Sequence, residues 1–323
     1  MTRADTSWNS EERIGVTSSA MTEILGPREV PLGGVRAMTV RRVLPHRSRT
    51  TIGPWCFLDH FGPHSVSETG GMVVPPHPHT GLQTVTWLFE GAIEHKDSTG
   101  GFATITPGSM NLMTAGSGIQ HSEISDPTST TLHGIQLWVA LPDEHRFQNP
   151  HFDSLTTTAQ PVGDGTLRLF LGSLEGFGTA KVPTYSPLVA AEITLPPGGT
   201  MELSVDRNFE HGLLGDTGSV TVGETTLDPH HLGYFPAGPD SLSVTNHGSQ
   251  QFRGVLIGGE PFDEPIVMWW NFIGRTHEEI EEFRKDWQSG LEVGSPRYGH
   301  LEHMDPLPAP EMPHVRLKAR LTR

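Results

Sequence analysis

The chain has 323 residues, enough for one large domain or two of ordinary size, and a formal net charge of −15 from 22 Lys and Arg against 37 Asp and Glu. Basic residues cluster only near the C-terminus, so we expect no direct binding to nucleic acid or to an anionic membrane. The sequence shows no signal-peptide-like segment, no run near the roughly 18 apolar residues of a membrane span, and a single cysteine, Cys56. We therefore expect a cytoplasmic protein without disulfides.

The N-terminal half begins with a polar, aperiodic segment, residues 1–25, which we expect to be a flexible extension. Residues 26–145 then contain short runs of β-branched and aromatic residues, each followed by a turn with Gly or Pro. Examples are QTVTWLFE before Gly91 and HGIQLWVAL before Pro142. Short strands at such even spacing are typical of a β-sandwich or β-barrel.

A second series of strand-like runs fills residues 166–290 and weakly echoes the first, with the turn PAGP in place of TPGS. This repeat predicts an all-β protein of two tandem barrels, joined by a polar linker over residues 146–165. A Thr-x-x-Glu capping box and an apolar stripe predict one helix over residues 276–288. The proline-rich tail, residues 291–323, should lack regular structure.

Two motifs place side chains of metal-binding type at strand spacing. His77 and His79 are separated by one residue in PPHPHTGLQTV, and His121 and Glu123 by one residue in GIQHSEIS. Residues i and i+2 of a strand project from one face, and a closed barrel can bring distant strands to one interior surface. Three imidazoles and a carboxylate suit Fe(II), Mn, Ni, Co or Cu, and they favour a structural zinc site less. The alternative is that His77 and His79 merely lie in a proline-rich turn.

Five segments carry a resemblance to a known family. They are GPWCFLDHFGP, PPHPHTGLQTVTWLFEGAIEHKDSTG, TPGSMNLMTAGSGIQHSE, HGIQLWVALP and LIGGEPFDEPIVMWWNFIGRTHEEIEEFRKDW. Over roughly residues 30–290 the chain resembles the pirin family of the cupin superfamily. The resemblance implies two tandem cupin barrels packed face to face and a single divalent metal in the N-terminal barrel, usually iron, with Mn, Ni, Co, Cu or Zn as alternatives. Its implied ligands are His77, His79, His121 and Glu123.

Two positions depart from the family's pattern. Thr80 stands where the family often has Arg, and Gln83 where it usually has Glu. A neutral amide at the pocket edge would change the local charge and remove a possible base. His95, with Asp97, is expected either to orient a ligand imidazole or to lie at a solvated hairpin edge. His133 is expected either to reach the pocket or to be a hydrogen-bonded core histidine.

The second half of the chain lacks a matching pair of motifs. His230 and His231 are adjacent, so a strand would direct them to opposite faces. We therefore expect no metal in the C-terminal barrel.

The resemblance implies two classes of function. The first is a dioxygenase that cleaves flavonols such as quercetin, a small aromatic substrate, with Glu123 as general base. The alternative is a non-enzymatic, iron-dependent regulatory protein that binds a transcription or metabolic protein; the acidic charge would suit a basic protein partner. A third possibility, left open by Thr80 and Gln83, is another cupin reaction.

Overall fold

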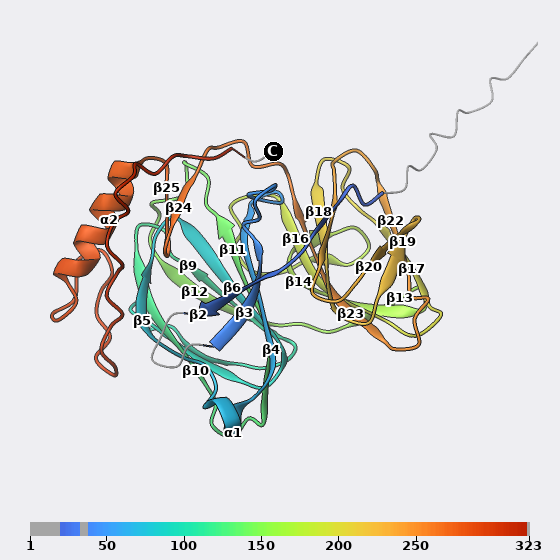
Figure 1. Ribbon diagram of the computed structural model, residues 1–323, viewed down its shortest axis with the longest axis horizontal. Helices are drawn as coiled ribbons and strands as arrows, with labels where there is room; N and C mark the ends of the chain where they lie inside the picture. Colours follow the sequence, from blue (N-terminus) through green and yellow to red (C-terminus); the bar gives the residue numbers. More distant parts are fainter. Residues whose placement is uncertain (1–19, 33–37, 322–323) are drawn as a thin grey trace, which may run out of the picture.

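The computed structural model describes residues 20–32 and 38–321, and it shows two β-barrels side by side with a helical segment against the first (Figure 1). Each barrel combines a large antiparallel sheet with a small one. The prediction of an all-β protein with two tandem barrels is therefore confirmed. No helix in the described part of the chain is long and apolar enough to cross a bilayer.

The N-terminal barrel consists of a seven-stranded and a four-stranded sheet. In spatial order the large sheet contains β12 (His151–Thr156), β9 (Ser109–Thr114), β6 (Leu82–Glu90), β11 (Thr131–Ala140), β4 (Trp55–Ser65), β3 (Met38–Leu44) and β2 (Arg28–Leu32). The small sheet contains β5 (Val73–His79), β10 (Ile119–Ser125), β7 (Ile93–Asp97) and β8 (Phe102–Ile105). One helical turn, α1 (Val66–Thr69), follows β4.

The C-terminal barrel repeats this plan. Its large sheet contains β1 (Glu23–Leu25), β21 (Leu232–Phe235), β18 (Glu210–Thr217), β23 (Phe252–Gly259), β16 (Leu188–Leu195), β14 (Gly165–Leu174), β13 (Gln160–Val162) and, beside β14, β15 (Gly178–Thr179). Its small sheet contains β17 (Thr200–Ser204), β22 (Ser241–Thr245), β19 (Val220–Val222) and β20 (Thr225–Leu227).

The two large sheets pack against each other through a shared hydrophobic cluster of fully buried side chains. Trp87 of β6 stacks on Phe170 of β14 with ring centroids 4.4 Å apart. The Trp87 indole nitrogen donates a hydrogen bond to Glu192 at 2.7 Å. Because of this packing, the large sheet of the first barrel is buried on both faces: one lines the barrel interior and the other the interface.

Each end of the chain contacts the barrel formed by the other half. β1 pairs with β21 in the second barrel's sheet. The hairpin of β24 (Val267–Trp269) and β25 (Phe272–Gly274), together with α2 (His277–Ser289), lies against the first barrel (Figure 1). The first barrel is therefore completed by residues from the end of the sequence.

Two predicted boundaries need correction. Of the expected flexible extension, residues 1–19 lie outside the described residues, but Glu23–Leu25 forms strand β1 because the second barrel's sheet offers it a partner. The expected linker, residues 146–165, contains β12 of the first barrel and β13 of the second. Its polar residues form strands because each pairs with an edge of an existing sheet.

The predicted helix is confirmed as α2. Its N-cap, Thr276, accepts a hydrogen bond from the Glu279 backbone N–H at 3.2 Å. The Glu279 carboxylate accepts in turn from the Arg275 backbone N–H at 2.7 Å, one residue before the position expected in a capping box. The tail beyond α2 forms only isolated bridges among its described residues.

Candidate metal centre

Strand β5 presents two histidines at the edge of the small sheet. The strand contains Pro75, Pro76 and Pro78, which lack a backbone N–H and are tolerated at a sheet edge. The pairing with β10 shifts by one residue beside the first two prolines, which is a β-bulge. His77 and His79 follow this bulge within the strand, so the alternative of a proline-rich turn does not hold.

The free side of β5 is covered by the C-terminal segment. The Leu307 backbone N–H donates to the Pro76 carbonyl at 2.8 Å, and the Ile273 N–H donates to the Thr80 carbonyl at 3.0 Å. The Thr80 hydroxyl lies 3.1 Å from the Tyr298 hydroxyl. Thr80 therefore helps to fix the C-terminal segment on the strand that carries both histidines.

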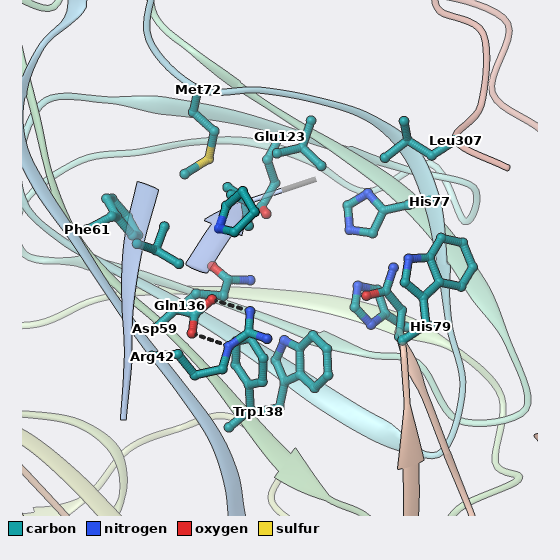
Figure 2. Close-up of a pocket in the computed structure, with 17 residues that line it drawn as sticks. Arg42, Asp59, Phe61, Met72, His77, His79, Glu123, Gln136, Trp138 and Leu307 are labelled. Carbon is teal, nitrogen blue, oxygen red and sulfur yellow. Dashed lines mark hydrogen bonds and ion pairs between the residues drawn. The ribbon is translucent and has the colours of Figure 1, made fainter. Parts of the chain in front are cut away.

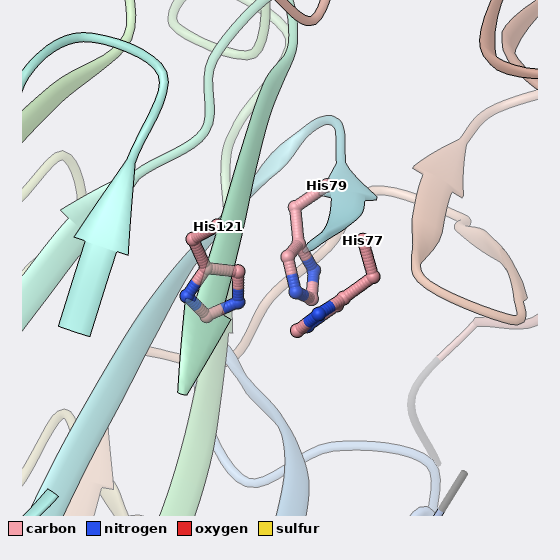
Figure 3. Close-up of side chains that lie close together, drawn as sticks. All are labelled: His77, His79 and His121. Atoms are coloured by element: carbon pink, nitrogen blue, oxygen red, sulfur yellow. The ribbon is translucent and has the colours of Figure 1, made fainter. Parts of the chain in front are cut away.

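Three imidazoles meet inside the first barrel (Figure 3). His121 of β10 lies opposite His77 of β5. The ring centroids of these two residues are 4.3 Å apart, and each is 5.0 Å from the centroid of His79. One nitrogen from each ring lies within 4.8 Å of the others. This clustering brings three possible nitrogen ligands around one point, as binding of a single ion requires.

The hydrogen bonds leave a ring nitrogen of each histidine free to bind a metal. His77 Nδ1 donates to the Pro75 carbonyl at 2.9 Å, so its Nε2 carries the lone pair. His121 Nε2 is buried and has no hydrogen-bond partner among the described residues. His79 interacts with the Asn271 backbone through one ring nitrogen, so its other ring nitrogen stays unpaired. Unpaired buried nitrogens are costly, and a metal ion would satisfy them.

Burial keeps these three histidines neutral, which is the form that binds metal. It lowers the pKa of His77 to about 4 and that of His79 and His121 well below the usual value. The residues present therefore fit a single metal ion.

His95 is buried beside His121 and does not lie at a solvated hairpin edge. His95 Nε2 lies 3.0 Å from Asp97 Oδ2, and its Nδ1 lies 3.3 Å from His121 Nδ1. If His95 donates to the carboxylate, it accepts from His121 Nδ1–H and leaves His121 Nε2 as the metal-binding atom. The pKa of Asp97 is lowered overall. Burial by itself would raise this pKa, but the hydrogen bonds from His95 and Thr99 outweigh burial.

Glu123 lies beside the three histidines rather than among them. A carboxylate oxygen is within 4.8 Å of nitrogens of His121 and His95, whereas the group of His77, His79 and His121 does not include Glu123. Thr86 donates to Glu123 Oε1 at 3.0 Å. Burial raises the pKa of Glu123 and outweighs its hydrogen bonds, so this carboxylate takes up a proton more readily than an exposed one.

His77, His79 and Glu123 line a cavity of about 400 Å³ with a largely aromatic and apolar wall (Figure 2). His121 lies next to this cavity, beside His77 and His79. The other residues that line it are Pro31, Leu32, Val40, Arg42, Phe57, Asp59, Phe61, Met72, Val74, Gln136, Trp138, Trp270, Asn271 and Leu307. The cavity has the size and lining of a small-molecule site.

The structure does not bring Gln83 to this cavity. The side chains of Thr84 and Thr86 alternate with it along β6, so Gln83 faces the second barrel. Its amide nitrogen donates to the Thr114 hydroxyl at 2.8 Å and to the Pro183 carbonyl at 3.2 Å. The departure at Gln83 therefore does not change the charge of the pocket.

His133 also faces away from the cavity, and the core-histidine reading applies. Its Nε2 lies 2.7 Å from Asp216 of the second barrel, which is bound at 2.8 Å by His60. Arg253 donates to the other oxygen of Asp216 at 2.6 Å and approaches His133 Nδ1 at 3.3 Å. His133 therefore belongs to a buried network that joins the two barrels.

Sequence reasoning missed several residues of the pocket. Arg42 and Asp59 form a bidentate ion pair on the pocket wall, and Trp270, Asn271 and Leu307 reach it from the C-terminal segment. Trp270 has a φ of 52°, a left-handed value that is rare for a residue with a large side chain. No local motif marks these residues, because they meet the histidines only through long-range packing.

The fold and the site define a protein with two cupin-type barrels and, inside the first, a group of three histidines suited to a single metal ion. Family models match both barrels: Pirin over residues 37–139 and the Pirin C-terminal cupin domain over residues 190–292. This chain belongs to the pirin family.

Individual relatives match nearly the whole chain. PA1205 of Pseudomonas aeruginosa, named provisionally as a quercetin 2,3-dioxygenase, is 39% identical, covering 94% of this chain and 98% of its own. A pirin-like protein of Caulobacter vibrioides is 36% identical, with coverage of 84% and 94%. A crystal structure of quercetin 2,3-dioxygenase from Acinetobacter baumannii has a TM-score of 0.85 and 33% identity, with coverage of 92% and 97%.

Proposed function

We propose that this protein is a metal-dependent dioxygenase that cleaves a flavonol-type aromatic substrate with dioxygen, with Fe(II) as the metal. The observation that carries the proposal is the meeting of three buried, neutral imidazoles, two of which line one end of an aromatic-lined cavity. The named quercetin 2,3-dioxygenases among its relatives support the same reaction class.

His77, His79 and His121 would hold the metal, with Glu123 beside them. A divalent metal bound there would lower the pKa of a substrate hydroxyl. His95 and Asp97 keep His121 in the tautomer that presents Nε2 to the site.

Glu123 is placed to take the substrate's hydroxyl proton. Its raised pKa makes the carboxylate an effective acceptor, and the Thr86 hydroxyl holds one of its oxygens in position. Trp138 and Phe57 stack at 4.0 Å and give a flat wall against which an aromatic substrate can lie.

The first test is the metal content of purified protein by mass spectrometry, followed by oxygen uptake with quercetin on the same sample. About one iron per chain, lost in His77→Ala, together with oxygen uptake is the expected result. Metal without oxygen uptake would contradict the dioxygenase proposal and favour the regulatory alternative. No metal, even after reconstitution with iron, would contradict the metal centre itself.

The second test concerns the base. Glu123→Gln should retain much of the metal but lower the turnover of quercetin by about 100-fold, a typical share for general base catalysis. Glu210→Gln is a matched control, since Glu210 is buried in the second barrel and bound to Tyr234 and the Gly53 N–H. Unchanged turnover in Glu123→Gln would exclude the base role.

A further inference from the structure

A row of polar side chains crosses the inner face of the large sheet in the first barrel. Arg42 of β3 is paired with Asp59 of β4, Asp59 with Gln136 of β11, and Gln136 with Thr86 of β6. The Thr86 hydroxyl contacts Gln136 Oε1 at 2.8 Å and Glu123 Oε1 at 3.0 Å. The row therefore runs from the far wall of the cavity to the carboxylate beside the metal site.

Arg42 and Asp59 form the far end of this row. Arg42 Nε donates to Asp59 Oδ1 at 2.7 Å and Nη2 donates to Oδ2 at 2.8 Å. These contacts leave Arg42 Nη1 without a hydrogen-bond partner among the residues that the structure describes, while both residues line the cavity. Each oxygen of Asp59 keeps a second lone pair. The pair therefore offers the cavity a donor and an acceptor side by side.

The ion pair lies on the sheet that faces the histidines. His77 and His79 belong to β5 in the small sheet, whereas Arg42 and Asp59 belong to β3 and β4 in the large sheet. Figure 2 shows Arg42 and Asp59 at one side of the cavity and both histidines at the other. A ligand that reaches both groups must span the cavity.

A continuous aromatic surface joins the two ends. The Arg42 guanidinium lies 4.4 Å from the centroid of the Phe57 ring, which stacks on Trp138 at 4.0 Å with planes inclined by 11°. Trp138 meets His79 edge to face, with centroids 5.2 Å apart. This surface favours a flat aromatic ligand that extends from the histidines toward Arg42.

The charges of the pair determine which ligand group fits it. A ligand carboxylate would accept a hydrogen bond from Arg42 but would be repelled by Asp59. A ligand ammonium would donate to Asp59 but would be repelled by Arg42. A hydroxyl group can accept from Arg42 Nη1 and donate to Asp59 at once. The pair is therefore complementary to a neutral phenolic hydroxyl.

We propose that Arg42 and Asp59 are specificity-determining residues that bind a hydroxyl group at the end of an aromatic substrate remote from the metal. This inference rests on the proposed function and narrows its substrate class to hydroxylated aromatic compounds that carry a hydroxyl beyond the metal-chelating group. Compounds that have only the chelating group lack the contact.

Two flavonols test this assignment on the full-length, iron-loaded protein. Quercetin and 3-hydroxyflavone share the same hydroxyl–carbonyl chelating group, but 3-hydroxyflavone has no other hydroxyl. Dissociation constants are measured without oxygen by quenching of tryptophan fluorescence, and kcat/KM is measured separately by oxygen uptake. The wild type should bind quercetin at least about 10-fold more tightly, the range expected for a hydrogen bond to a charged group.

Two conservative variants remove the discrimination. Arg42→Lys keeps the positive charge but removes the planar guanidinium that donates several hydrogen bonds at once. Asp59→Asn keeps the shape of the side chain but removes its negative charge. Each should shift the ratio of the two dissociation constants by about 10-fold toward 3-hydroxyflavone. The ratio is insensitive to partial misfolding, since misfolding lowers the apparent affinity for both ligands by the same factor. Arg253→Lys disrupts a similar ion pair, with Asp216 outside the cavity, and should leave the ratio unchanged.

The outcomes separate this proposal from the proposed function. If Arg42→Lys and Asp59→Asn weaken the binding of both flavonols by the same factor, the pair is structural and the inference is overturned. If the ratio shifts as expected but no oxygen is consumed, the hydroxyl site stands and the dioxygenase assignment fails. If oxygen is consumed and the ratio does not shift, the dioxygenase assignment stands and the hydroxyl site fails.

Discussion

The two barrels have the same architecture, but their interiors differ. Among the described residues, 19 of the 23 buried polar or charged side chains precede residue 134, in the first barrel. The interior of the second barrel is a cluster of aliphatic and aromatic side chains. Its one buried histidine among the described residues, His211, borders a cavity of about 330 Å³. In the described part of the chain, His211 belongs to no group of side chains that could hold a metal ion.

This difference separates a barrel that contains the candidate metal centre from a barrel with a mainly apolar interior. Burying polar groups is unfavourable unless they are hydrogen-bonded or bind a ligand. In the first barrel this cost falls on His121, whose buried Nε2 has no hydrogen-bond partner among the described residues and would be satisfied by a metal ion. The second barrel instead supplies Phe170 and its apolar neighbours, which cover the outer face of the first barrel's large sheet.

The largest expected effect is the loss of metal from a variant of the first barrel. His121→Ala removes a proposed ligand and should lower bound metal at least about 10-fold. Loss of a residue that only orients a ligand already costs about 10-fold or more, so loss of a ligand should cost at least as much. The measurement is metal content by mass spectrometry. His211→Ala is the matched control, since it removes a buried histidine from the second barrel. Equal metal loss in both variants would contradict the division of roles between the barrels.

The interface should contribute to stability but not to metal binding. Phe170 is fully buried and stacks on Trp87, so Phe170→Ala should lower the free energy of unfolding by about 3–5 kcal/mol. Trp87→Phe keeps the stacking, loses the bond to Glu192, and should cost about 1 kcal/mol. Urea denaturation measures both. A cost below about 1 kcal/mol for Phe170→Ala would show that the barrels do not depend on this contact.

A smaller effect concerns pH and the lone buried histidine of the second barrel. Burial lowers the pKa of His211 to about 4, whereas the unfolded value is about 6.5. Between these values the unfolded chain binds more protons, so the free energy of unfolding falls as the pH falls. His211→Leu should reduce this fall by at most about 1.4 kcal/mol per pH unit.

Urea denaturation of the metal-free protein at about pH 7, 6 and 5 tests the His211 effect. Packing changes caused by the leucine are present at every pH, so only the slope reports the titration. Parallel profiles for the wild type and His211→Leu would contradict the buried, neutral state of His211.

The meeting of His77, His79 and His121 could be predicted because the signal is local. His77 and His79, like His121 and Glu123, lie two residues apart, and strand geometry alone directs such pairs to one face. The prediction for Gln83 failed for a related reason. Both faces of β6 are buried, one by the barrel interior and one by the second barrel, so hydrophobicity does not show which face Gln83 occupies.

The sequence by itself determined the strand-rich architecture, the late helix and the residue types of the metal site, since these depend on composition and short spacings. Only the tertiary structure decided that Arg42 and Asp59 lie across the cavity from the histidines, and that Trp270 and Leu307 close it from the C-terminal segment. It also decided that His133 joins the interface, where Asp216 of the second barrel binds it. These positions depend on contacts between residues far apart in the chain, and no local pattern encodes such contacts.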